Sequence, residues 1–147
     1  MDPSSMPPIS PSSKPRPIVA ISMGDPAGIG PEIVARAMAR PEVHAMCRPL
    51  AIGDAGVITD AARRVCPGVA VRAVAAVREA RFAPGAIDVI DLRNVPAGRL
   101  RLGEVLAVAG NAAFEAVRRM IELAMAGEVD ATVTAPIHKE ALFRAGH

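Results

Sequence analysis

Aromatic residues are nearly absent from this chain, which has three Phe and no Trp or Tyr among its 147 residues. Hydrophobic residues nonetheless make up 51% of the sequence, so a core has to be built from Ala, Val, Ile, Leu and Met. All-β sandwiches rely more on aromatic and β-branched side chains. The composition therefore favours a buried α/β sheet, in a chain of a length that ordinarily makes one domain.

The chain also lacks a strong excess of charge and a long apolar run. Its formal net charge is +2, and the basic residues are scattered without interleaved aromatics on which bases could stack. No apolar run approaches the roughly 18–20 residues that span a membrane, and the first residues contain no apolar signal-peptide core. We therefore expect no nucleic-acid partner, no membrane association and a cytoplasmic location.

Cysteine and histidine are too sparse to predict a metal centre. Cys47 and Cys66 have no partner at metal-ligand spacing, and two cysteines are too few for a disulfide framework. We expect each thiol to be a small buried hydrophobic group. His44, His138 and His147 share no i,i+4 or H-E-x-x-H spacing, so no metal site is predicted, and His44 is assigned to a polar connection without function.

A glycine-rich stretch at residues 23–32, Met-Gly-Asp-Pro-Ala-Gly-Ile-Gly-Pro-Glu, organises the rest of the chain. The apolar run 18–23 leads into it, and the apolar-periodic run 33–39 leads out. This order predicts a strand, a glycine turn and a helix that ends at Arg40-Pro41. The glycines that we expect to allow a positive φ and close backbone approach are Gly24, Gly28 and Gly30.

Two interpretations of this glycine turn are open. The free N–H groups of a helix N-terminus can bind a phosphate, or the turn can simply connect strand to helix. The spacing matches neither of the two standard nucleotide-binding fingerprints. Asp25 would orient a substrate hydroxyl or cation, or bond the backbone of its own turn. We expect Gly28→Val to disrupt the turn and to weaken phosphate binding, since a side chain at a positive φ costs on the order of 1–2 kcal/mol.

The remainder of the chain alternates between strand and helix patterns, with Asp54 placed to cap the second helix. Alternation of this kind predicts a doubly wound, mainly parallel α/β sheet. Residues 1–16 are rich in Pro and Ser and are expected to be a disordered tail before an α/β domain at 17–147. The expected strands are 49–54, 69–74, 87–92 and 130–134, and the expected helices are 55–65, 102–126 and 137–145, with a turn and loop at 75–85.

Ligands of open α/β sheets bind beyond the carboxyl ends of the strands, where three polar turns are expected. These are the turns at 24–25, at 53–54 and at 134–139. In the last of them Lys139 can place a point charge on a phosphate, and His138 can donate a hydrogen bond or move a proton. A purely structural or surface role for this His-Lys pair is an equally open interpretation.

Several of these motifs together resemble the 4-hydroxythreonine-4-phosphate dehydrogenase family. The resemblance is carried by residues 23–32, by Val-Thr-Ala-Pro-Ile-His-Lys-Glu-Ala-Leu at 133–142 with Ala-Gly-His at 145–147, and by Glu-Ala-Arg-Phe-Ala-Pro-Gly at 79–85. It extends over roughly residues 17–147. Within the family, the chain is most similar to the branch that acts on four-carbon sugar-acid phosphates.

The resemblance implies a fold similar to isocitrate and isopropylmalate dehydrogenases, and an NAD-dependent homodimer. Such enzymes oxidise a phosphorylated hydroxy acid, here 4-phosphohydroxy-L-threonine in pyridoxal 5′-phosphate biosynthesis. The resulting β-keto acid loses carbon dioxide with the help of a divalent metal. Alternatives are D-threonate 4-phosphate, D-erythronate 4-phosphate or a dihydrodiol as substrate, a phosphotransacetylase-like acyltransferase, or an inactive fragment.

The family's Gly-His-Thr-Glu motif, metal-binding histidines and most cofactor contacts follow the segment that matches residues 145–147. We therefore expect an incomplete sheet, no catalytic residue and no metal ligand in this chain. Alone, it should be inactive and fold poorly, with one sheet edge and one apolar helix face exposed. The residues carried over as candidates for lining a substrate or phosphate pocket are Gly24, Asp25, Gly28, Gly30, Pro136, His138 and Lys139.

Overall fold

The structure is a computed structural model that describes residues 15–147. Most of the expected tail, residues 1–14, lies outside the described residues. Arg16, which that prediction also assigned to the tail, is bound to the rest of the chain. Its guanidinium donates to the carbonyl of His44, and its own carbonyl accepts from Nε of Arg48 at 2.7 Å. The tail prediction is therefore wrong at Arg16.

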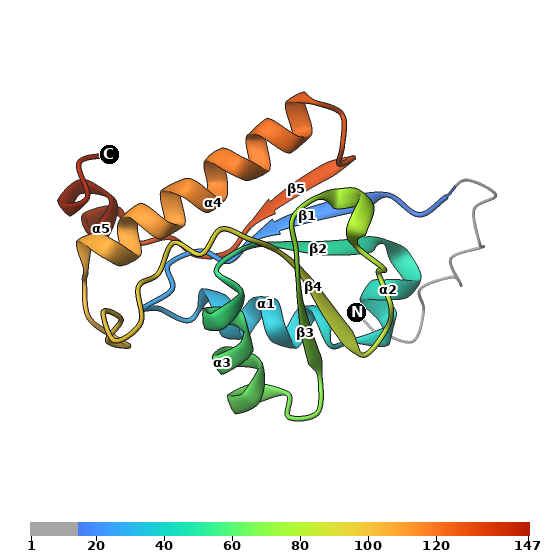
Figure 1. Cartoon of the computed structure of the whole chain (residues 1–147), viewed down its shortest axis with the longest axis horizontal. Helices are drawn as coiled ribbons and strands as arrows, with labels where there is room; N and C mark the ends of the chain where they lie inside the picture. The colour runs from blue at the N-terminus through green and yellow to red at the C-terminus, as the bar shows by residue number, and fades with distance from the viewer. Residues whose placement is uncertain (1–14) are drawn as a thin grey trace, which may run out of the picture.

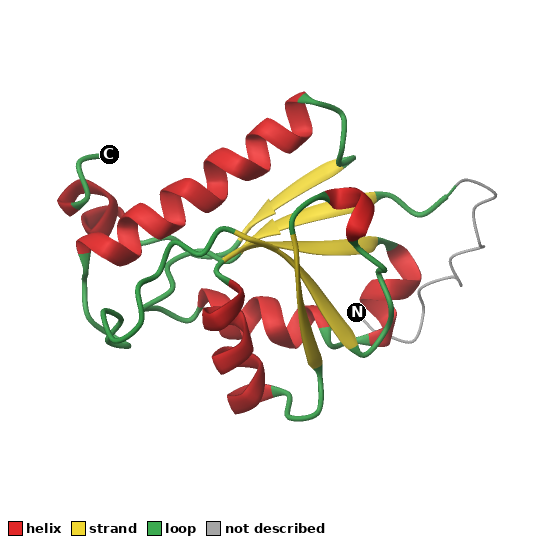
Figure 2. Cartoon of the chain, viewed as in Figure 1, coloured by secondary structure: helices red, strands yellow, loops and turns green. Residues whose placement is uncertain are grey.

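Five strands form one sheet, as Figures 1 and 2 show. Every neighbouring pair is parallel, which confirms the predicted parallel α/β class. The strands are β1 (Ile18–Ser22), β2 (Arg48–Gly53), β3 (Ala70–Val74), β4 (Ala86–Asp91) and β5 (Ala131–Thr134). Their order across the sheet is β3-β4-β2-β1-β5, so β1 lies between β2 and β5, and β5 is an edge strand.

Helices cover both faces of the sheet, which confirms the doubly wound arrangement. The helices are α1 (Gly30–Met38), α2 (Pro41–Met46), α3 (Ala55–Val65), α4 (Ala107–Met125) and α5 (Lys139–Arg144), with a short 3-10 helix η2 (Val77–Glu79) in the predicted loop 75–85. In Figure 1, α1 and α3 lie below the strands and α4 lies above them. Among the described residues, no helix is long and apolar enough to cross a membrane.

Strand side chains alternate between two hydrophobic clusters, one under each helical layer. Leu50 and Ile52 of β2 belong to the cluster beneath α4, whereas Ala51 between them belongs to the cluster against α1 and α3. This is the period of two that a strand requires. Five of the seven buried residues of α4 are Ala or Gly, so the helix lies close to the sheet without aromatic side chains. The two large buried residues are Met120 and Leu123 near its C-terminal end.

The long helix α4 begins five residues later than its apolar pattern predicts. Residues 102–106 are not helical, and they include a turn at 102–103 in which Gly103 adopts a φ of +82°. The amide of Gly103 donates to the carbonyl of Ala27 at 2.8 Å, so this segment is held against the glycine turn. A tertiary hydrogen bond and a left-handed glycine thus replace the first helical turn. At the other end, the predicted stop is confirmed, because Gly127 has a φ of +70°.

The connection after α1 contains a helix that the sequence analysis missed. Pro41 ends α1 as expected, but it also begins α2, since a proline fits the first turn of a helix. His44 on α2 is buried, and its Nε2 lies 2.8 Å from the carbonyl oxygen of Met38. The placement of His44 in a polar connection is therefore wrong.

A buried carboxylate ties the 75–85 segment to the sheet. Asp88 on β4 accepts hydrogen bonds from the amides of Arg81 at 2.8 Å and Phe82 at 2.7 Å. Its other oxygen is paired with the guanidinium of Arg72 on β3. Phe82 has a φ of +53°, which a non-glycine residue adopts only when its surroundings enforce it. Asp88 supplies that constraint.

Candidate functional site

The carboxyl ends of β1 and β5 form a point where the chain leaves the sheet in opposite directions. The two strands are neighbours and parallel. From β1 the chain enters α1 on one face, and from β5 it enters α5, which packs against α4 on the other face. Ligands of doubly wound sheets bind in the crevice outside such a switch point. The two turns with most of the predicted site residues lie here.

Backbone hydrogen bonds join these two turns directly. The amide of Asp25 donates to the carbonyl of Pro136 at 2.9 Å. Nearer the strands, the amide of Ala135 donates to the carbonyl of Ser22, the last residue of β1, at 3.2 Å. The glycine turn and the segment after β5 therefore form one continuous structure, although they lie near opposite ends of the sequence.

The three glycines of the turn have different roles. Gly24 has a φ of +72°, and a Cβ there would lie 2.3 Å from the carbonyl oxygen of Pro136. A Cβ on Gly30 would lie 2.4 Å from the carbonyl oxygen of Met23. Gly28 is exposed, and its Cβ would meet nothing closer than 3.6 Å. Positive φ is thus confirmed for Gly24 and wrong for Gly28 and Gly30, and the predicted close approach is wrong for Gly28 alone.

Asp25 bonds the backbone of its own turn, one of the two interpretations left open by the sequence. It is 6% exposed, and Oδ1 accepts from the amide of Ala27 at 2.8 Å. The amide of Gly28 donates to the carbonyl of Asp25 at 3.0 Å. The N–H groups of residues 25, 27 and 28 therefore already have partners within the protein and are not free donors for an anion.

The third polar turn, after β2, is structural. Oδ1 of Asp54 accepts from the amides of Gly56 at 2.9 Å and Val57 at 3.1 Å, which confirms the predicted cap of α3. Oδ2 accepts from the amide of Val95 at 3.0 Å. Asp54 therefore also fastens the loop that crosses from β4 to α4.

His138 and Lys139 are exposed beside the joined turns. Nδ1 of His138 accepts from the amide of Ala141 at 3.4 Å and caps α5. With Nδ1 as the acceptor, a neutral imidazole carries its proton on Nε2, which is then a donor toward solvent. Lys139 is the only lysine in residues 15–147. Gly28 and Pro136 are also exposed, so four candidates reach the surface, whereas Gly24, Asp25 and Gly30 form a buried frame.

The two cysteines lie away from this site and are half-buried, which corrects the expectation of full burial. Burial raises the pKa of the Cys47 thiol, and Arg16 partly offsets this effect. Burial likewise raises the pKa of the Cys66 thiol against an opposing effect of Arg36. A raised pKa lowers the fraction of each thiol that is present as the reactive thiolate.

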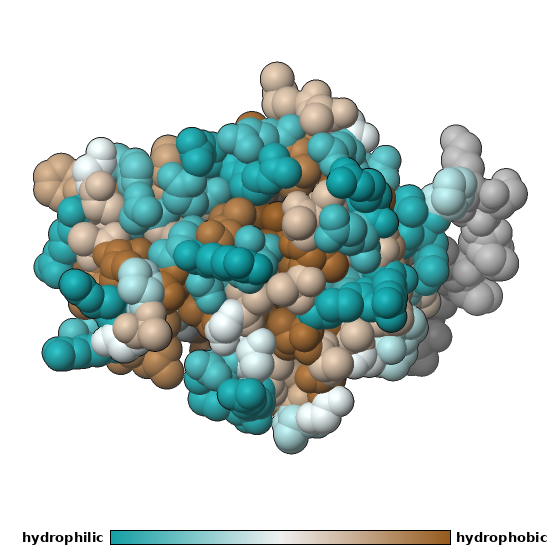
Figure 3. Space-filling view, in the orientation of Figure 1, coloured by the Kyte–Doolittle hydropathy of each residue, from teal (hydrophilic) through white to brown (hydrophobic). Residues whose placement is uncertain are grey.

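The described part of the chain, residues 15–147, has no group of three or more His, Cys, Asp or Glu side chains placed to hold a metal ion. On the face drawn in Figure 3, hydrophobic surface occurs in several areas separated by hydrophilic residues.

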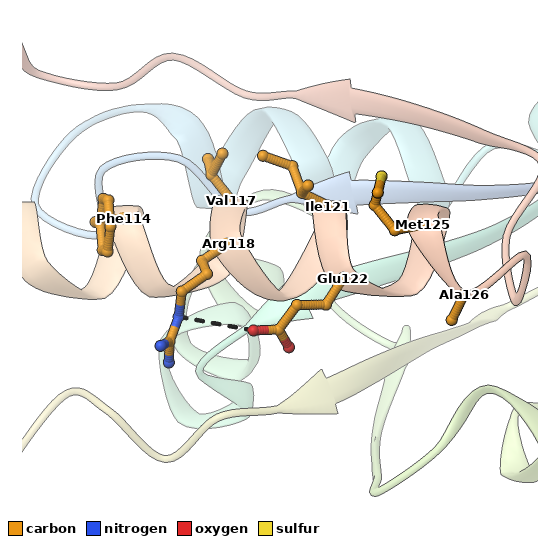
Figure 4. A pocket seen from close by; sticks show the side chains of 7 residues that line it. All are labelled: Phe114, Val117, Arg118, Ile121, Glu122, Met125 and Ala126. Atoms are coloured by element: carbon orange, nitrogen blue, oxygen red, sulfur yellow. Dashed lines mark ion pairs between the residues drawn. The ribbon is translucent and has the colours of Figure 1, made fainter.

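An apolar hollow of about 610 Å³ lies on the outer side of α4. Figure 4 shows Phe114, Val117, Ile121 and Met125 aligned along the helix, with the ion pair of Arg118 and Glu122 beside them. Ile121 is 52% and Met125 85% exposed, and the whole of edge strand β5 is exposed. The predicted exposure of one sheet edge and one apolar helix face is therefore confirmed. None of the candidate pocket residues lines this hollow.

Comparison with known proteins gives a consistent set of similarities. A family model described as pyridoxal phosphate biosynthetic protein PdxA matches residues 45–147. A relative from Symbiobacterium thermophilum is 50% identical over 127 residues, which cover 86% of this chain and 38% of the relative. D-threonate 4-phosphate dehydrogenase of Cupriavidus necator is 46% identical over 131 residues, covering 89% of this chain and 39% of that enzyme.

A solved structure is also similar. The crystal structure of a 4-hydroxythreonine-4-phosphate dehydrogenase from Burkholderia phymatum superposes with a TM-score of 0.88 and 42% sequence identity. The match covers 91% of this chain and 40% of that one. The chain thus spans about two fifths of the length of the relatives that it matches.

Proposed function

The chain belongs to the PdxA family of pyridoxal phosphate biosynthetic proteins, and from this membership we propose that it is part of a dehydrogenase of phosphorylated four-carbon hydroxy acids. We propose D-threonate 4-phosphate as the substrate, because the relative from Cupriavidus necator, 46% identical, carries that name. The dehydrogenase names of the relatives argue against the phosphotransacetylase-like alternative.

The observation that supports a pocket at this place is the hydrogen bond of 2.9 Å from the Asp25 amide to the Pro136 carbonyl. It holds Pro136 against the turn that ends β1, and His138 and Lys139, both exposed, follow two and three residues later. In the proposed complex, the ammonium group of Lys139 neutralises the substrate phosphate as a point charge. Nε2–H of His138 donates to an oxygen of the substrate.

NAD and a divalent metal are part of this proposal through the family resemblance. NAD would accept a hydride from the third carbon, whose hydroxyl group also loses its proton, so that a β-keto acid is formed. The residues described here do not fit a metal site, so we derive no step through a metal. Assembly into a homodimer and a cytoplasmic location belong to the same proposal.

A second candidate substrate is 4-phosphohydroxy-L-threonine. It is favoured by the name of the Burkholderia phymatum structure and by the family's description. The two acids differ at the second carbon, which bears a hydroxyl in one and an amine in the other. Both place a phosphate on the fourth carbon, so Lys139 would serve either of them and does not discriminate. D-erythronate 4-phosphate would serve equally, whereas a dihydrodiol lacks the phosphate.

Turnover by the intact protein tests the proposal. The assay follows NADH formation and carbon dioxide release with NAD, a divalent metal and each of the four compounds. We expect D-threonate 4-phosphate to give a kcat/KM at least about tenfold above that of the second candidate. A preference for 4-phosphohydroxy-L-threonine would replace the substrate proposed here. Inactivity with all four compounds would contradict the proposal that the protein is a dehydrogenase of this kind.

Replacing Lys139 by alanine in the intact protein is expected to raise KM for the phosphorylated substrate about tenfold, which corresponds to about 1.4 kcal/mol, with little change in kcat. A charge-assisted hydrogen bond to phosphate has this order of strength. The matched control is Arg78→Ala, because Arg78 lines a hollow beside Ile18 and Arg48, at the opposite end of the sheet. Equal KM values for the two variants would show that Lys139 does not bind the substrate phosphate.

A further inference from the structure

The first turns of α4 are in very close contact with α5, and the contact depends on one glycine. Gly110 is a buried residue of α4. A Cβ placed on it would lie 2.0 Å from the carbonyl oxygen of Ala141 and 2.6 Å from the amide nitrogen of Leu142. Both neighbours are backbone atoms of α5, which cannot give way by a change of rotamer. Only a residue without a Cβ allows the two helices to approach this closely.

This glycine is unfavourable for α4 itself. Glycine in a helix interior is destabilising relative to alanine, and the neighbours of Gly110 in α4 include Ala109, Ala112 and Ala113. Local helix propensity would therefore favour alanine at position 110 as well. Glycine is needed at position 110 because α5 comes too close for a Cβ. The residue therefore allows α5 to pack here, at a cost to the stability of α4.

Further contacts hold α5 and the residues after it at the same end of α4. Nη1 of Arg144 donates to the carbonyl of Val105 at 2.8 Å. Nε2 of His147 lies 3.0 Å from Oδ1 of Asn111, and the His147 ring stacks on Phe114 with centroids 3.7 Å apart. Together with the contact at Gly110, these interactions define one position for α5.

We propose that Gly110 is a positioning residue that sets where His138 and Lys139 lie relative to the glycine turn. This inference rests on the proposed function, in which those two side chains line the substrate pocket. The connecting segment is held at Pro136 by the amide of Asp25 and at residue 141 by the contact with Gly110. His138 and Lys139 lie between these two anchors, so they move when α5 moves.

The expected displacement is large on the scale of a binding site. Bringing a new Cβ from 2.0 Å to an ordinary contact of about 3.5 Å requires α5 to shift by about 1.5 Å. Misplacement of binding groups by about 1 Å can cost a hundredfold in rate. We therefore expect Gly110→Ala to raise KM for the phosphorylated substrate by about tenfold or more.

The experiment compares Gly110→Ala with Glu122→Ala in the intact protein. Glu122 is an exposed residue of the same helix that makes only ion pairs on the surface, so its replacement should leave α5 in place. The readouts are KM and kcat for the phosphorylated substrate, inhibition by inorganic phosphate, the melting curve, and the NMR shifts of the His147 ring protons. Stacking on Phe114 gives those protons a ring-current shift that reports the position of the segment.

For Gly110→Ala we expect a changed His147 shift, a raised KM and weaker inhibition by inorganic phosphate, all absent from Glu122→Ala. An unchanged His147 shift would show that Gly110 does not place α5. A changed shift with unchanged KM and phosphate inhibition would show that the placement of α5 does not matter to the pocket. Either result overturns the inference.

If Gly110→Ala does not fold, the double variant Asn111→Ala and Arg144→Ala releases α5 without adding a side chain at the contact. It should weaken phosphate inhibition in the same way, and unchanged inhibition would overturn the inference. Failure of the proposed function is distinguishable, because it appears as a lack of turnover in the unsubstituted protein. The His147 shift reports on Gly110 whether or not a substrate is turned over.

Discussion

Replacing Gly24 by alanine is expected to lower the free energy of unfolding by about 2–4 kcal/mol, a large effect for one methyl group. A left-handed conformation costs an L-residue about 1–2 kcal/mol, and Gly24 has a φ of +72°. The added Cβ would also lie 2.3 Å from the carbonyl oxygen of Pro136. Relief of that clash breaks the bond between the Asp25 amide and the same oxygen, and with it the join between the two turns.

Urea and thermal unfolding measure this effect, and the fall in Tm should be roughly 5–15 °C. Gly28→Ala is the matched control in the same turn. Gly28 has no left-handed φ, is exposed, and would place its Cβ in ordinary contact at 3.6 Å. Its replacement should be neutral or stabilise by up to about 1 kcal/mol, since alanine restricts the unfolded chain. Equal stability of the two variants would show that the join at Pro136 does not constrain Gly24.

Replacing Asp88 by alanine is expected to cost about 3–5 kcal/mol. Asp88 is 2% exposed, and its carboxylate accepts two backbone amides and the Arg72 guanidinium. Without it, the amides of Arg81 and Phe82 and a partly buried cation lose their acceptor together. Phe82 also loses the constraint on its positive φ, so the 75–85 segment should detach from the sheet.

Denaturant unfolding measures the loss, and hydrogen exchange at the amides of Arg81 and Phe82 locates it. Asp60→Ala is the control, because Asp60 forms only an exposed ion pair with Arg63. Exposed pairs contribute about 0–1 kcal/mol, so this variant should stay close to the parent. A loss at Asp88 no greater than at Asp60 would mean that water replaces the carboxylate as the acceptor.

The sheet was predictable because its strands are short apolar runs separated by turn residues. Each predicted strand is present within one or two residues of its expected bounds, and Asp54 caps α3 as its position indicated. These features depend on neighbours in sequence, such as side-chain alternation and a carboxylate within reach of the next amides. The placement of the turns at 24–25, 53–54 and 134–139 at one edge of the sheet was also predictable, because parallel strands end at the same edge. The hydrogen bonds that join the first of these turns to the last were not predicted.

The sequence-based prediction was wrong at the start of α4 and at α2. The apolar pattern that starts at Leu102 would continue a helix, but the Gly103 amide is bonded to Ala27. His44 belongs to the short helix α2, which begins at Pro41, and Nε2 of its imidazole lies 2.8 Å from the carbonyl oxygen of Met38. Ala27, the partner of Gly103, is far from it in the sequence, so no local pattern indicates this bond. The helix α2 was missed for a local reason, because Pro41 was interpreted only as the end of α1 and it also begins α2.

The sequence by itself determined the fold class, the family and the set of turns that meet at the carboxyl edge of the sheet. These follow from apolar periodicity, turn chemistry and motifs, all of which are local in the chain. Only the tertiary structure decided which glycines have no room for a Cβ. Gly24, Gly30 and Gly110 are required where the backbone of another segment or turn approaches too closely for a Cβ, whereas Gly28 is not. The distance between two backbone segments depends on how helices and strands pack in three dimensions, and it cannot be read from the order of the residues.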